Sequence, residues 1–134
     1  MTICLTELKN RPSVIPFTTE ELSVLKMQAQ SELIPHIRLR AAQMGVTCGR
    51  ITIRSQKSRW GSCSGKGNLN FNCLLMLAPP EVRDYVIVHE LCLLRHMNHS
   101  PAFWKEVETL LPDYRNHQKW LKESGESLIR RLPK

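Results

Sequence analysis

Long apolar runs and paired cysteines are both missing from this sequence. No segment approaches the roughly 20 consecutive apolar residues that a membrane-spanning helix needs, which excludes an integral membrane protein of that kind. The 5 cysteines include no CxxC pair, and an odd number at irregular spacing argues against a disulfide scaffold. The first residues show no basic start followed by an apolar run, so no secretory signal is expected. These absences together predict a reducing, cytoplasmic compartment.

Acidic residues are absent from the stretch 33–80, which still contains Arg38, Arg40, Arg50, Arg54, Lys57, Arg59 and Lys66. Because the remaining basic residues are balanced by the 12 acids of the chain, this stretch accounts for the whole formal net charge of +7. A basic surface of this kind could contact nucleic acid, a phosphorylated ligand or an acidic partner. The alternative is that these side chains are simply solvated.

The length of 134 residues suits a single domain. Hydrophobic residues make up 42% and charged residues 23%, which is ordinary for a globular protein and argues against disorder. A domain of this size can bury a core without metals or disulfides. We therefore expect one folded domain over residues 1–134, with residues 1–16 as an N-terminal extension.

Residues 17–45 carry the pattern of a long helix. Thr18 and Glu21 have the spacing of a capping box at its start. Gly45 is a typical C-terminal stop, and Pro35 should kink or split the helix. Apolar residues recur every three or four positions and predict one buried face, made of Leu22, Leu25, Ala29, Leu33, Ile37, Ala41 and Met44.

Two short segments, Ile51–Arg54 and Leu69–Cys73, alternate apolar and polar residues as half-buried strands do. The loop 58–67 between them is rich in glycine and serine. The economical interpretation is an antiparallel β-hairpin over residues 50–73, although the sequence does not give the order of pairing.

Helices are expected over residues 80–95 and 101–132, and the order of one helix, strands and then helices predicts an α+β fold. Within 80–95, His89 and Glu90 interrupt an apolar run, where an ionisable pair is costly unless it is partnered. In an HExxH helix, two histidines four residues apart bind zinc and the glutamate activates the metal-bound water. Here the position four residues after His89 is Leu93, so the His-Glu pair alone is weak evidence for a metal site.

The motifs around this helix are longer and more specific: Arg59-Trp60-Gly61-Ser62-Cys63-Ser64, Leu77-Ala78-Pro79-Pro80, Asp84-Tyr85-Val86-Ile87-Val88-His89-Glu90-Leu91-Cys92 and Asn98-His99-Ser100-Pro101-Ala102-Phe103-Trp104. Through them, residues 50–121 closely resemble the YgjP-like metallopeptidase family, a relative of the SprT-like and WLM zincins. The resemblance implies a zincin-like single domain with an N-terminal helix, an antiparallel β-hairpin or small sheet, an active-site helix and C-terminal helices. It also implies a Zn²⁺ cofactor and a peptide or protein substrate.

Carried over by position, the family pattern makes His89 the first zinc ligand, Glu90 the general base and His99 a further ligand. The second ligand falls on Leu93, which offers no lone pair. A catalytic zinc normally has three protein ligands and one open position for water, so we expect zinc to be held weakly or not at all. Three explanations stay open: a substitution in an otherwise active enzyme, a naturally inactive relative, or a ligand from another residue.

The substitute ligands are poor ones. Cys92 lies three residues after His89, a spacing that a helix can use, and a thiolate binds zinc well. In the family, however, a small residue at that place packs. His96 lies seven residues after His89, about 10 Å along the helix axis, which is too far for both to share one metal. His36 and His117 are expected to be surface or satisfied histidines.

Arg59, Trp60, Gly61 and Ser62 are candidates for the substrate cleft. In zincins a strand runs beside the metal helix and can pair with an extended substrate, and the hairpin 50–73 is placed to do so. The alternative, which suits a large aromatic residue better, is that Arg59 and Trp60 lock the hairpin onto the helix. We also expect the basic residues of 33–66 to share one face with the mouth of this cleft.

The sequence therefore predicts a zinc-dependent hydrolase, a metallopeptidase impaired by Leu93. One alternative is a catalytically silent module that binds nucleic acid or protein through the basic stretch 33–80. The other is a metal-dependent hydrolase of phosphorylated small molecules or nucleotides, for which a basic cleft would also be suitable. No membrane partner is expected.

Overall fold

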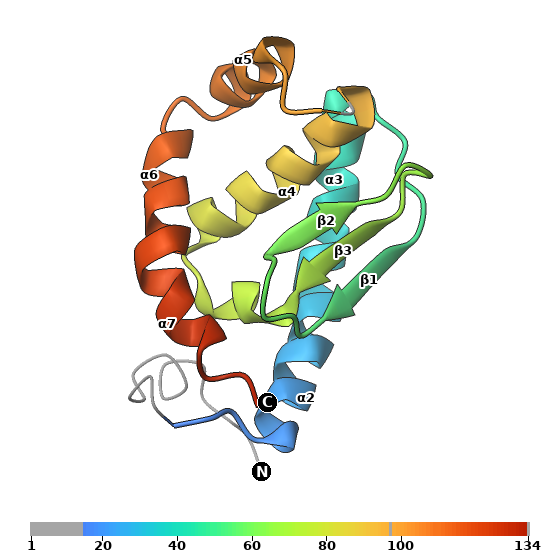
Figure 1. Cartoon of the computed structure of the whole chain (residues 1–134). Helices are drawn as coiled ribbons and strands as arrows, with labels where there is room; N and C mark the ends of the chain where they lie inside the picture. The colour runs from blue at the N-terminus through green and yellow to red at the C-terminus, as the bar shows by residue number, and fades with distance from the viewer. Residues whose placement is uncertain (1–14, 97, 134) are drawn as a thin grey trace.

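The computed structural model of the chain describes residues 15–96 and 98–133 (Figure 1). Most of the expected extension 1–16 therefore lies outside the described residues. The domain combines a small three-stranded sheet with helices, which confirms the predicted α+β class. Within the described ranges, no helix is both long and apolar enough to cross a membrane.

The first long helix is built from α2 (Thr19–Gln28), a π-helical turn η1 (Ala29–Leu33) and α3 (Ile34–Met44). It begins as predicted, because Thr18 and Glu21 form both hydrogen bonds of a capping box. It ends at Gly45, whose φ of 69° lies in the left-handed region that glycine adopts without strain. Pro35 cannot donate a backbone hydrogen bond, and the helix is irregular just before it, at η1.

The sheet consists of β1 (Ile51–Arg54), β2 (Gly61–Cys63) and β3 (Leu69–Asn72), in the order β1-β3-β2. The predicted antiparallel pairing of the first and last of these segments is wrong, because β1 and β3 run parallel. The antiparallel partner of β3 is β2, which lies within the segment expected to be a loop. A three-residue strand shows too little alternation to be recognised, yet it reverses the chain between β1 and β3 and so makes them parallel.

The remaining helices follow β3 in the chain. After a 3-10 turn η2 (Cys73–Leu77) come α4 (Pro80–Arg95), α5 (Pro101–Leu110), α6 (Tyr114–Trp120), a π-helical turn η3 (Leu121–Gly125) and α7 (Glu126–Ile129). The bounds of α4 agree with the prediction for 80–95. Segment 101–132 is divided into several helices, and Ser100 caps the first of them by accepting a hydrogen bond from the backbone N–H of Phe103.

The core lies between the sheet and the helices. Leu69 and Phe71 of β3 turn their side chains inward and are almost fully buried. Helix α3 passes behind the sheet, while α4 crosses beside it and separates it from α6 and α7 (Figure 1). The apolar stripe predicted for residues 22–44 is buried along its whole length. Helix α4 is therefore a central element, with packed neighbours on several sides.

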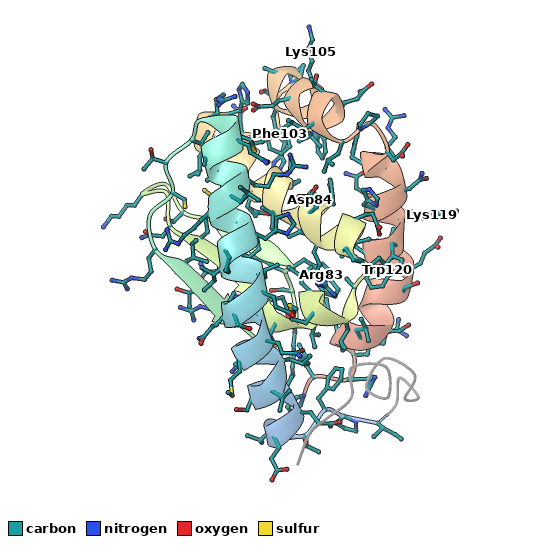
Figure 2. All side chains as sticks on the ribbon, turned by 180° about the vertical axis from the view of Figure 1, so that it is seen from behind. Arg83, Asp84, Phe103, Lys105, Lys119 and Trp120 are labelled. Carbon is teal, nitrogen blue, oxygen red and sulfur yellow. The ribbon has the colours of Figure 1, made fainter. Side chains whose placement is uncertain are left out.

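Asp84, which is labelled in Figure 2, is the centre of an ionic cluster that joins α3 to α4. Arg40 donates two hydrogen bonds to this carboxylate, from Nε at 2.9 Å and from Nη2 at 2.6 Å, and His36 Nε2 lies 3.1 Å from it. Burial alone would raise the pKa of Asp84, but Arg40 and His36 together outweigh it, so the pKa is lowered. The ionised carboxylate is thus the form that the fold stabilises.

Replacing Asp84 by asparagine should lower the free energy of unfolding by about 1–3 kcal/mol at neutral pH, because hydrogen bonds to a charged group are lost. A carboxyl whose pKa is lowered on folding stabilises the protein above its unfolded pKa, and this contribution disappears as the pH falls through the folded pKa. The difference between Asp84→Asn and the unaltered protein should therefore shrink in acid. Urea titrations at neutral and acidic pH measure it, with Asp113→Asn, at an exposed residue, as the control. A difference that is constant with pH would contradict the argument.

Candidate metal and peptide site

Helix α4 presents His89 and Glu90 at the side that faces β2. The His89 side chain is 20% exposed and that of Glu90 only 6%. His89 Nδ1 lies 2.9 Å from Glu90 Oε2, so the two ionisable groups are hydrogen-bonded to each other. This contact supplies the partner that a buried carboxylate needs.

His99 approaches His89 from the loop between α4 and α5, as predicted. The two imidazole rings lie 5.2 Å apart between centroids. Phe103 touches both rings edge-on, at 5.1 Å from His89 and 5.0 Å from His99. Trp104 stacks on His99 at 6.0 Å. Aromatic side chains at the start of α5 therefore hold the loop histidine against the helix histidine.

The pair of histidines does not make a complete metal site. Leu93 lies one turn after His89 on the same face of α4, at the position where a second imidazole would be needed. Among residues 15–96 and 98–133, no group of three or more histidine, cysteine, aspartate or glutamate side chains could hold a metal ion. The donors among the described residues therefore do not fit a catalytic zinc, which takes three protein ligands.

Cys92 and His96 do not complete the set. The Cys92 thiol is fully buried, and burial, together with the nearby Glu106 carboxylate, raises its pKa to about 12. Since the thiolate is the form that binds zinc, this argues against Cys92 as a ligand. His96 Nε2 instead lies 3.3 Å from Glu106 Oε1, and Arg95 pairs with the same carboxylate.

A cavity of about 260 Å³ opens beside His89, the candidate ligand of α4, and Glu90, the candidate general base. Three of the predicted cleft residues, Arg59, Trp60 and Gly61, contribute to its lining, which also includes Tyr85, Val86, His89, Glu90 and Leu121. Burial is the main cause that raises the pKa of Tyr85 to about 12, so its hydroxyl stays protonated at neutral pH. The cavity combines a mostly apolar wall with one carboxylate and one guanidinium.

Three residues of the cavity lining were not predicted from the sequence: Tyr85, Val86 and Leu121. The spacing of Tyr85, four residues before His89, was a usable signal, because residues four apart share a helix face. Leu121 comes from η3, more than 30 residues further along the chain, and no local pattern points to it. Such a residue reaches the cavity only through the tertiary fold.

Gly61 allows β2 to approach α4 closely. A Cβ atom at this position would lie 3.0 Å from Glu90 Cγ and 3.2 Å from Val86 Cγ1, tighter than ordinary contacts. Ser62, the fourth predicted cleft residue, is absent from the cavity lining, and its hydroxyl oxygen lies 3.4 Å from Asn70 Nδ2. Alternation along the strand explains the difference, because neighbouring residues face opposite sides of a sheet.

Strand β2 lies at the edge of the sheet that borders the cavity. Asn72 donates its backbone N–H to the Trp60 carbonyl, and Ser64 donates to Asn68, both at 2.9 Å. In an antiparallel ladder the bonded residues alternate. The backbone groups of Gly61 and Cys63 therefore point away from β3, toward the open edge.

The Trp60 side chain packs against the C-terminal helical segment. A Cβ atom at Gly125 would lie only 2.7 Å from Trp60 Cζ2, so this glycine makes room for the indole. This contact supports the expectation that Trp60 holds the strand region in place. Trp60 also lines the cavity, where a substrate could contact it.

The basic residues do not gather at the cavity mouth as expected. Arg59 belongs to the lining, but Arg40 is paired with Asp84. Arg50 and Arg54 lie at the two ends of β1, which is the opposite edge of the sheet from β2. The acid-free stretch 33–80 therefore contributes basic residues to several separate surfaces and does not form one basic face at the cavity mouth.

Comparisons with known proteins identify the family and a similar fold. The family model described as a YgjP-like metallopeptidase domain matches residues 20–124. Among solved structures, the metallopeptidase zymogen of Pyrococcus abyssi abylysin is similar, with a TM-score of 0.58 and 22% identity over 65% of this chain and 90% of that chain. At this identity the likeness concerns the fold. None of the curated proteins matches the sequence significantly.

Proposed function

The chain belongs to the YgjP-like metallopeptidase family, and on that premise we propose that its cleft binds an extended peptide while hydrolysis is weak or absent. The observation that carries the proposal is the position of the open edge of β2 beside Glu90 in one cavity. A peptide that adds to a sheet edge gains main-chain hydrogen bonds, and pockets for its side chains give specificity.

The residues of the cavity suit such a peptide. Outward-facing backbone groups at Gly61 and Cys63 supply one donor and one acceptor each for the peptide backbone. Tyr85, Val86 and Leu121 form an apolar wall for one of its side chains, and Arg59 lies at the same cavity as a cationic group. We propose that Trp60 contacts the peptide at the end of the cleft.

The proposed loss of hydrolysis follows from Leu93. Zinc would supply the Lewis acid and the activated water of the family's reaction, but the imidazoles of His89 and His99 are too few to hold it. Glu90 is the residue that corresponds to the general base. In this chain its carboxylate is engaged by His89 Nδ1, so it has a stable resting partner without any metal.

A peptide mixture tests the binding half of the proposal. A tryptic digest of casein, added to the ¹⁵N-labelled protein, should shift the amide resonances of Gly61 and Cys63 and of the cavity residues most strongly. Cys63→Pro, which removes an outward N–H that β3 does not use, should weaken this binding about tenfold, roughly the value of one hydrogen bond in a desolvated edge. Ser62→Ala, on the other face of the same strand, is the matched control.

The hydrolytic half has its own measurement. Unaltered protein and Glu90→Gln should cleave intact casein equally slowly, since the carboxylate has no held metal-bound water to act on. Shifts that are absent, or that fall away from β2, would overturn the peptide-binding proposal. Faster cleavage by the unaltered protein than by Glu90→Gln would overturn the proposed impairment.

The phosphohydrolase alternative receives less support from the cavity. A site for a phosphorylated small molecule needs several cationic donors. Among the described residues that line this cavity, Arg59 is the one arginine or lysine, and Glu90 adds a carboxylate. We therefore place the peptide first among the ligands of this cleft.

A further inference from the structure

The two faces of the sheet differ sharply in character. Leu69 and Phe71 of β3, Ile51 and Ile53 of β1 and Cys63 of β2 belong to or pack against the core. By alternation, the residues between them face the other side. None of the helices described in residues 15–96 and 98–133 covers that other side, because α3 and α4 lie on the core side in Figure 1, and Figure 2 shows the same layer from behind. One end of the face is closed by the loop after β1, where Asn72 is buried and donates to the carbonyls of Gln56 and Arg59.

A row of hydrogen-bonding side chains crosses this open face. The strand register places Thr52 beside Asn70 and Asn70 beside Ser62, one residue from each strand. Asn70 accepts a hydrogen bond from Arg54 Nε at 2.9 Å, and its amide nitrogen lies 3.4 Å from the Ser62 hydroxyl. The amide is thereby oriented, and it holds the Arg54 guanidinium over the face.

The cations at this face have no ionic partner among the residues that the structure describes. Arg50 and Arg54 are exposed. Arg54 stands on the same side of the sheet as Thr52, two residues before it in β1, and Arg50 directly precedes this strand. Within residues 15–96 and 98–133, neither has a carboxylate within ion-pair distance, whereas Arg40, Arg95 and Arg130 each have one. The strands and the loops that join them contain no acid, and they add Lys57 and Lys66.

We propose that the open face of the sheet binds the phosphate backbone of a nucleic acid. Arginine presents a planar fork that matches phosphate oxygens, and amide and hydroxyl side chains make the remaining contacts to phosphate and sugar in such interfaces. The combination of two exposed arginines, which have no carboxylate partner among the described residues, with an oriented Asn-Ser-Thr row is therefore suited to a regular chain of phosphates. The surface is separate from the cleft, so the inference does not depend on peptide binding there.

Fluorescence anisotropy with labelled oligothymidylate tests the proposal. Binding should be measurable at low salt and should weaken steeply as salt is added, because phosphate contacts release counterions. Arg50→Gln with Arg54→Gln should reduce affinity about tenfold. Each exposed ion pair with a phosphate contributes up to about fivefold, and the double variant removes two of them. The slope of log K against log salt should fall by about 1.4, or about 0.7 for each lost phosphate contact.

The matched control removes the same charge elsewhere. Arg115→Gln with Arg130→Gln lowers the net charge by two on α6 and at the end of α7. It should reduce affinity by less than a third of the effect of the sheet pair. An equal loss in both double variants would show that binding follows net charge alone and would overturn the assignment to this face.

Two further outcomes would also overturn it. One is no binding of oligothymidylate or oligouridylate at low salt by a protein whose circular dichroism shows it to be folded. The other is equally tight binding of polyglutamate, which would identify an acidic polypeptide rather than a nucleic acid as the partner. Asn70→Ala offers an independent check, because it frees Arg54 without removing charge, and it should weaken oligothymidylate binding while net charge stays constant.

Discussion

Leu93→His should give a protein that holds about one zinc ion per molecule, whereas we expect the unaltered protein to retain little zinc. The new imidazole would lie one helical turn from His89, and with His99 it would complete the three protein ligands of a catalytic zinc. Because metal that binds the folded state alone stabilises it, zinc should also raise the melting temperature of the variant. Metal analysis after gentle purification and thermal unfolding with and without zinc measure both effects.

Leu94→His is the matched control for this experiment. It adds the same side chain at the next position, rotated by about 100° around the helix axis, so the imidazole points away from His89. This variant should hold no more zinc than the unaltered protein. Tightly held, stoichiometric zinc in the unaltered protein would contradict the argument, and Cys92→Ala would then show whether the buried thiol supplies a ligand.

Phe103→Ala should be the most destabilising single change near the site, with a loss of about 3–5 kcal/mol in the free energy of unfolding. The phenyl ring is fully buried and contacts both His89 and His99. Its removal leaves a cavity that the start of α5 cannot close, because Ser100 and Pro101 fix the first turn of that helix. Denaturant titration measures the loss.

The exposed Leu39 gives a matched large-to-small control for this substitution. It is 58% exposed on α3, so Leu39→Ala should change stability by no more than about 0.5 kcal/mol. Combined with Leu93→His, Phe103→Ala should also weaken zinc binding by about tenfold or more, as loss of the groups that orient a ligand does. Unchanged zinc affinity in that double variant would mean that the ring supports the fold without positioning His99.

The helices could be predicted because their signals are local. The capping box at Thr18, the glycine stop at Gly45 and the cap at Ser100 each depend on residues within one turn of the helix end. Local signals did not predict that His89 and His99 lie close together. That prediction came from the family resemblance. Helix periodicity alone places His89 on a face but says nothing about the loop beyond.

The sheet could not be predicted in the same way. Strand β2 is three residues long and contains Gly61 and Ser62, neither of which favours a strand by itself. Its existence depends on pairing with β3 on one side and on contact with α4 on the other. Because β2 was not predicted, β1 and β3 were expected to form an antiparallel hairpin, although they pair in parallel. The expectation that the basic residues would share one face with the cleft assumed this hairpin at the border of the cleft.

The strand order also bears on how the domain reaches its native state. Strands β2 and β3 are joined by a tight turn in which Ser64 donates to Asn68 and Gly67 to Ser64, so they can pair early at little cost in loop entropy. Strand β1 joins β3 in parallel, and the chain between them, residues 55–68, is longer and includes β2 itself. The cavity edge can thus form from a local hairpin, while the outer strand with Arg50 and Arg54 completes the sheet afterwards.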